Sequence, residues 1–108
     1  MSAKWEEFID NLQDEAATLI KDDLRTLIMT AQDDSNAFVQ RQGEKLELYL
    51  NQLADGAITK EQFEGYVTDI RDLTKMQSLK MSVAGKARAQ RLAKGITKIV
   101  IKGLMAAL

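Results

Sequence analysis

The 108-residue sequence contains no cysteine, no histidine and no proline, and each absence excludes a class of structure or chemistry. Without cysteine there is no disulfide framework and no thiol nucleophile. Without histidine the chain lacks the commonest general base and metal ligand. A calcium loop starting at Asp33 would place Phe38, instead of glycine, at its sixth position. We therefore expect a protein that is not an enzyme and binds no cofactor or metal, and the absence of proline favours helices throughout.

A long apolar run is also missing. The N-terminal stretch MSAKWEEFIDNL contains acidic residues where a secretory signal would be uniformly apolar. The most apolar window, Gly95 to Leu108, is 14 residues long and includes two lysines, whereas a membrane-spanning helix needs about 18 apolar residues. We expect a cytoplasmic protein by default, with membrane association or export by a signal-independent route as alternatives.

Apolar residues recur at helical spacing through the first half of the chain and predict one long helix. One line of apolar residues repeats every eleven positions, which is three helical turns: Trp5, Ala16, Leu27, Phe38 and Tyr49. Asp33–Asn36 interrupts the pattern with residues that favour turns and helix caps. Because a turn would usually reset the register, we expect a continuous helix from about Ser2 to Ala54, with a break at Asp33–Asn36 as the alternative.

The clearest helix end is Asp55-Gly56. Gly56 suits the left-handed position that follows a helix, and Thr59 with Gln62 forms a capping box for the next helix. The stretch LADGAITKEQF, residues 53–63, resembles the helix–turn–helix of the small SHOCT-type C-terminal domains, a likeness that implies no function. A single domain over 1–108 is thus expected, with a first arm over 1–54, a turn over 55–58 and a second arm over 59–108. Two arms of about 50 residues would each be about 75 Å long. The predicted fold is all-α, a long antiparallel helical hairpin, with a three- or four-helix bundle as the alternative.

Charge is distributed unevenly along the chain. All 16 acidic residues lie in residues 1–72, whereas residues 73–108 contain eight Lys or Arg and no acid. Five of these cations fall on one stripe of a helix, called here the basic face. The basic face consists of Lys80, Arg91, Lys94, Lys98 and Lys102. In the hairpin it would lie beside acids of the first arm, such as Asp10, Asp22 and Asp33, and pair with them. The alternative is that it stays free for a partner.

The opposite side of the C-terminal segment combines bulky apolar residues with small ones. Small residues four apart let another helix approach closely. They occur in two runs, Gly85, Ala89 and Ala93, followed by Gly103 and Ala107. Because a two-helix hairpin leaves wide apolar surfaces in water, we expect the hairpins to assemble into a homo-oligomer.

Residues 84–108, AGKARAQRLAKGITKIVIKGLMAAL, resemble cationic membrane-active peptides in composition. Together, the patterns predict a non-enzymatic, self-assembling helical protein whose basic amphipathic segment, residues 73–108, binds or inserts into an anionic membrane, pore formation included. A small adaptor or regulatory module that binds another helical protein is the alternative. A nucleic-acid binder ranks third, because no aromatic residue follows Tyr66.

Overall fold

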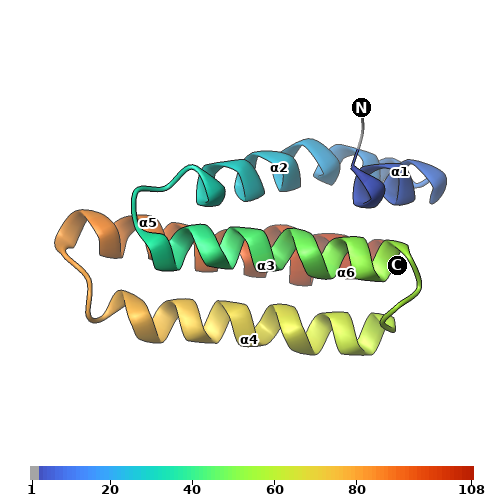
Figure 1. Ribbon diagram of the computed structural model, residues 1–108. Helices are drawn as coiled ribbons and strands as arrows, with labels where there is room; N and C mark the ends of the chain where they lie inside the picture. The colour runs from blue at the N-terminus through green and yellow to red at the C-terminus, as the bar shows by residue number, and fades with distance from the viewer. Residues whose placement is uncertain (1–2) are drawn as a thin grey trace.

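A computed structural model describes residues 3–108, and its regular elements are all helical. The elements are α1 (Lys4–Asn11), α2 (Glu15–Gln32), α3 (Ala37–Ala54), α4 (Lys60–Ser78), α5 (Val83–Gly95), the π-helix η1 (Ile96–Leu104) and α6 (Met105–Ala107). The last three follow one another without a break and form one long helix, called here the C-terminal rod (Figure 1). The expectation of an all-α protein is confirmed.

The expected hairpin of two long helices is wrong, because the chain also turns between α2 and α3 and between α4 and α5. Figure 1 shows α2, α3, α4 and the C-terminal rod side by side, each antiparallel to the next. The contacts of α2 with η1 close this arrangement into a four-helix bundle, to which α1 adds a short helix. The molecule measures 41 × 26 × 20 Å, whereas a 50-residue helix alone would be about 75 Å long.

The first long helix ends at Asp33–Asn36, where the sequence had favoured continuity. The Oδ1 atom of Asn36 accepts hydrogen bonds from the backbone N–H groups of Phe38 (2.9 Å) and Val39 (3.2 Å). The carboxylate of Asp34 accepts one from the N–H of Asn36 at 2.8 Å. These side chains satisfy N–H groups that the start of a helix leaves without partners. Asn36 is therefore the N-cap of α3.

A second break separates α1 from α2. Gln13 adopts a positive φ of 54°, and the carboxylate of Asp14 then caps α2 by accepting from the N–H of Ala17 at 3.0 Å. The expected helix start at Ser2 lies outside the described residues. Trp5 fixes α1 to α3: its ring is buried, its indole N–H donates to Glu47 at 3.3 Å, and its backbone N–H donates to Asn51 at 3.2 Å.

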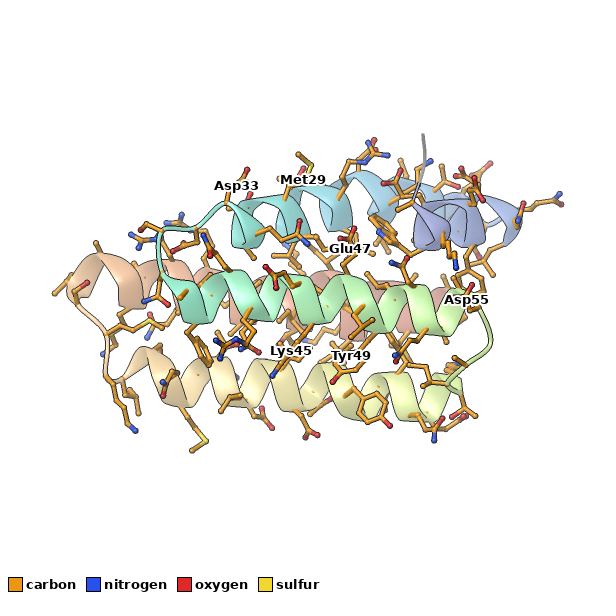
Figure 2. All side chains as sticks on the ribbon, in the orientation of Figure 1. Met29, Asp33, Lys45, Glu47, Tyr49 and Asp55 are labelled. Carbon is orange, nitrogen blue, oxygen red and sulfur yellow. The ribbon has the colours of Figure 1, made fainter. Side chains whose placement is uncertain are left out.

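The core does not follow the eleven-residue line on which the continuous helix was based. Of that line only Trp5 is buried; Ala16 is exposed, and Leu27, Phe38 and Tyr49 are half-buried. The buried residues lie on separate faces of each helix, including Leu24 and Ile28 of α2, Leu46 and Leu50 of α3, and Phe63 and Val67 of α4. Figure 2 shows Met29 and Asp33 on the outer side of α2, and Lys45 and Tyr49 pointing from α3 towards α4.

The turn between α3 and α4 contains Asp55, Gly56 and Thr59. Gly56 has φ 75°, in the left-handed region. The hydroxyl of Thr59 accepts from the N–H of Gln62 at 3.1 Å, and the side chain of Gln62 accepts from the N–H of Thr59 at 2.9 Å. This reciprocal pair is a capping box, and it starts α4 directly after the reversal.

Candidate functional site

The basic face lies on the C-terminal rod and on the turn before it. Ser82 is the N-cap of the rod and accepts a hydrogen bond from the N–H of Gly85 at 3.3 Å. The inner side of the rod is apolar and buried, and its residues recur every three or four positions. They include Ala89, Ala93, Ile96, Val100 and Leu104. The apolar side of this amphipathic helix is therefore already covered by the rest of the chain.

All five side chains of the basic face are exposed to solvent: Lys80, Arg91, Lys94, Lys98 and Lys102. Within residues 3–108, none of the five forms an ion pair. Two of the expected partners on the first arm are engaged elsewhere, because Asp10 pairs with Lys21 at 2.7 Å and Asp22 with Arg25 at 3.4 Å. The third, Asp33, is exposed and forms no ion pair with the basic face within residues 3–108. The expected neutralisation of the basic face by the first arm is wrong, since it assumed the register of the hairpin.

Lys94 lies in the last turn of α5, whereas Lys98 and Lys102 lie in the π-helix η1. In a π-helix the hydrogen bonds run from i to i+5, so each turn is wider than that of an α-helix. The buried row of Ile96, Val100 and Leu104 lies wholly within η1.

One cation of the C-terminal segment is paired across the bundle. The Nε atom of Arg88 lies 2.8 Å from the carboxylate of Asp34, whose side chain is only 5 % exposed. Burial alone would raise the pKa of Asp34, but the hydrogen bonds from Arg88 and Asn36 and the positive charge of Arg88 outweigh it, so this pKa lies below its ordinary value. The ion pair connects the α2–α3 turn to α5.

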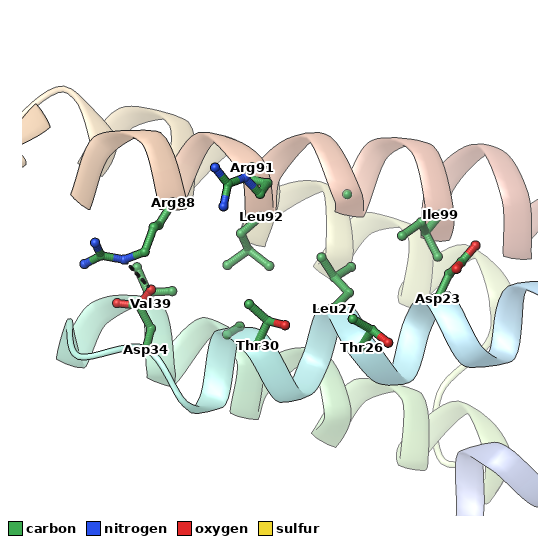
Figure 3. Close-up of a pocket in the computed structure, with 12 residues that line it drawn as sticks. Asp23, Thr26, Leu27, Thr30, Asp34, Val39, Arg88, Arg91, Leu92 and Ile99 are labelled. Carbon is green, nitrogen blue, oxygen red and sulfur yellow. Dashed lines mark hydrogen bonds and ion pairs between the residues drawn. The ribbon is translucent and has the colours of Figure 1, made fainter. Parts of the chain in front are cut away.

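Beside this ion pair, α2 and α5 leave a groove of about 350 Å³. Figure 3 shows Thr26, Leu27 and Thr30 of α2 on one side and Leu92 and Ile99 of the C-terminal rod on the other. The floor is apolar and Arg91 lies at the rim. Of the basic face, only Arg91 lines this groove, which is also lined by the charged residues Asp23, Asp34 and Arg88.

The small residues of the C-terminal segment lie along its packed side. Gly85, Ala89 and Ala93 are buried, and Gly103 and Ala107 are half-buried. A methyl group built on Gly103 would lie 2.8 Å from Cδ1 of Ile20 on α2. At Gly103 another helix of the same chain therefore comes close, whereas Gly85 faces Met81 and Ser82 of the preceding turn.

In the part of the chain that the structure describes, no three acidic side chains come together as a potential metal site. None of the helices over residues 3–108 has the length and apolarity needed to cross a membrane. No protein-family model, curated protein or solved structure matches the chain.

Sequence reasoning missed Asp34 and Arg88 as partners. It also missed three exposed apolar side chains around the α4–α5 turn, Met76, Leu79 and Val83. For Asp34, the available signal was the run Asp-Asp-Ser-Asn, in which several residues can cap a helix. For the exposed apolar residues, the available signal was Ser82. It is a good N-cap, so it indicates that a new helix starts there and that a turn precedes it.

Proposed function

We propose that this protein is a non-enzymatic helical bundle that binds anionic membrane surfaces through the basic face while the bundle stays folded. The observation that carries the proposal is the basic face itself: four exposed cations on the C-terminal rod and one on the turn before it, none of them in an ion pair within residues 3–108.

The shape of the basic face supports a flat partner. From Arg91 to Lys102 it extends about 16 Å at about 1.5 Å per residue. Each Lys or Arg close to an anionic leaflet contributes about 1 kcal/mol of attraction, and this attraction is screened by salt. Five such cations together correspond to a dissociation constant in the range of about 0.1–1 mM. Charge alone therefore gives weak, reversible attachment.

Binding in the manner of a free amphipathic peptide is disfavoured. In that mode the apolar side of the C-terminal rod would enter the membrane, but Ile96, Val100 and Leu104 are fully buried in the bundle. Burying each such side chain contributes about 1.5–3 kcal/mol to folding. Insertion would expose the remaining core of the bundle, so surface attachment of the folded molecule is the better-supported mode.

Vesicle cosedimentation tests the proposal. The protein should sediment with phosphatidylserine-containing vesicles at low salt, remain in solution with pure phosphatidylcholine vesicles, and be released by about 0.5 M salt. Replacing Lys94, Lys98 and Lys102 together by Gln should weaken binding by about 100-fold, from about 1 kcal/mol per cation.

The matched control removes the same charge elsewhere. Arg41, Lys45 and Lys60 lie on α3 and α4 and form no ion pair within the described residues. Their replacement by Gln should leave most of the binding intact. Equal losses in both variants would mean that only net charge matters, and no binding at low salt would refute the proposed function.

A second candidate, self-association or docking of a helical protein, is favoured by the exposed apolar side chains of α4 and its C-cap. Tyr66, Leu73, Met76 and Leu79 are exposed there, at 37, 41, 65 and 72 %. The sequence predicted a homo-oligomer because a two-helix hairpin would leave wide apolar surfaces uncovered. The four-helix bundle buries these surfaces within one chain, so this argument no longer applies. Light scattering tests this candidate: a stable dimer that ignores anionic vesicles would favour it over membrane binding.

A further inference from the structure

The most exposed apolar side chains of the C-terminal half gather at one end of the bundle. Val83 is 90 % exposed, Leu79 is 72 % exposed and Met76 is 65 % exposed. Leu79 lies in the turn between α4 and α5, residues 79–82, and Met76 and Val83 lie on either side of this turn. Figure 1 shows the turn at the end of the bundle opposite the α3–α4 turn. We call Met76, Leu79 and Val83 the apolar tip.

Folding does not account for the apolar tip. The inward positions of this region are taken by Thr74, Ser78 and Gly85, all of which are buried. Leu79 and Val83 could be polar without loss of core packing, because both are largely in solvent. A groove of about 570 Å³ lies between α4 and α5, and its lining includes Met76, Leu79 and Ala93. An exposed apolar cluster of this kind indicates an interaction surface.

The charges around the apolar tip are almost all positive. Lys75 and Lys80 are exposed, Lys86 is half-buried, and within residues 3–108 none of the three is in an ion pair. No acidic residue occurs after Asp72. The nearest acids are Asp72, one helical turn before Met76 and paired with Arg71, and two residues of the α2–α3 turn. Of these two, Asp34 is neutralised by Arg88 and Asp33 is exposed.

Apolar side chains surrounded by lysines match the chemistry of an anionic lipid interface. There the apolar groups enter the boundary between headgroups and acyl chains, while lysines extend their ammonium groups to the phosphates. We propose that the apolar tip inserts into the interface of an anionic membrane, with Leu79 and Val83 as the inserted side chains. This inference rests on the proposed function and adds to it the second, apolar contribution that stable attachment requires in addition to charge.

Site-specific labelling gives the direct test, because the chain contains no cysteine of its own. Leu79→Cys would carry a polarity-sensitive fluorophore. The control is Leu19→Cys on α2, whose native side chain is exposed to a similar degree, 76 % against 72 %. With phosphatidylserine-containing vesicles the label at residue 79 should shift to the blue and be quenched by spin-labelled lipid, whereas the label at residue 19 should not.

Binding measurements separate this inference from the proposed function. Leu79→Ser combined with Val83→Ser should weaken vesicle binding by about 10-fold or more while leaving the remaining binding salt-sensitive. The control pair, Leu19→Ser with Met29→Ser, should bind as the unmodified protein does. Since all four side chains are more than half exposed, the variants should keep their melting temperatures.

Three results would overturn the inference, and they have different meanings. If the protein binds anionic vesicles but the residue-79 label does not shift and the serine variant binds normally, the apolar tip is not inserted and the proposed function stands. If the unmodified protein does not bind at low salt, both fail. If the serine substitutions convert a dimer to a monomer without changing vesicle binding, a second copy of the chain covers the apolar tip.

Discussion

Replacing Gly43 by Ala tests how closely α2 and α3 are packed. Gly43 lies inside α3 and is buried. A methyl group at this position would lie 2.8 Å from Cβ of Ala31, 3.0 Å from the backbone N of Gln32 and 3.2 Å from the backbone C of Ala31. Two of these three atoms belong to the backbone of α2, which cannot rotate away as a side chain can. The substitution therefore requires α2 to move.

Two opposing effects decide whether Gly43→Ala raises or lowers the free energy of unfolding. Alanine has a higher helix propensity than glycine, which would stabilise the folded state by about 1 kcal/mol. Overpacking a close contact typically costs about 1–3 kcal/mol. Because the contact involves backbone, we expect the cost to exceed the gain and the free energy of unfolding to fall by about 1 kcal/mol. For a chain of this size that corresponds to a decrease in melting temperature of about 4 °C.

Gly65→Ala is the matched control. Gly65 lies inside α4, is exposed, and has no atom within 4 Å of the position of an added methyl group. Only the propensity term applies, so this substitution should raise the free energy of unfolding by about 0.5–1 kcal/mol. Urea unfolding followed by circular dichroism measures both variants. Equal stabilisation by both substitutions would refute the close approach of α2 and α3.

A double substitution tests whether the contact with Ala31 is responsible. Removing the methyl group of Ala31 eliminates the 2.8 Å contact and leaves the 3.0 Å approach to Gln32. Gly43→Ala with Ala31→Gly should therefore be less destabilised than the sum of the two single changes, by about 0.5 kcal/mol or more. Simple additivity would show that the two residues do not interact.

Four further predictions concern stability. Gly56→Val should lower the free energy of unfolding by about 1 kcal/mol or more, because φ is 75° at this position; an unchanged melting temperature would contradict a left-handed turn. Asn36→Ala should cost about 1 kcal/mol through loss of the N-cap of α3, whereas Ser35→Ala, at an exposed position beside it, should have little effect in the same thermal melts. Gln42→Leu should stabilise by about 1 kcal/mol, because the buried Oε1 atom of Gln42 has no hydrogen-bond partner; destabilisation would indicate a partner. Asp34→Asn should lower the free energy of unfolding at pH 7 by about 1 kcal/mol. The pKa of Asp34 is depressed in the folded state. The stabilisation by the Asp34 carboxylate should therefore be present above about pH 4 and disappear as the pH falls further.

The helical content and the α3–α4 turn could be predicted from the sequence because both depend on local chemistry. The absence of proline and the helical spacing of apolar residues act within a few turns of the chain. The capping box of Thr59 and Gln62 involves residues three apart. Such features do not depend on which distant segments become neighbours.

The turn at Asp33–Asn36 could not be settled from the sequence. A capped turn of four residues can leave apolar residues at eleven-residue spacing on both sides of it, so the line through Leu27 and Phe38 looked continuous although neither residue belongs to the buried core. Gln42, by contrast, is a polar residue of α3 that is buried. Only the packing of separate helices reveals which of several possible apolar faces is buried.

The candidate site was predictable as a pattern but not in its environment. Helical spacing placed Lys80, Arg91, Lys94, Lys98 and Lys102 on one stripe of a continuous helix. Four of them do lie on the C-terminal rod, whereas Lys80 lies in the α4–α5 turn. Whether acids neutralise that stripe depends on which helix lies beside it and in which register. The π-helix η1, which contains Lys98 and Lys102, also has no sequence signature that we could use.

The arrangement of the ion pairs explains how a protein of formal net charge −1 could attach to an anionic surface. Two acids of α1 are paired within the first part of the bundle, since Lys21 pairs with Asp10 and Arg25 with Glu6. Among the ion pairs of residues 3–108, that of Arg88 with Asp34 is the one that joins the C-terminal segment to the first half of the chain. The five cations of the basic face are exposed and take part in none of these ion pairs. A surface field of this kind orients a protein before contact even when its net charge is close to zero. Attachment should then depend on the position of the cations rather than on their number, and the two glutamine triple variants separate these possibilities.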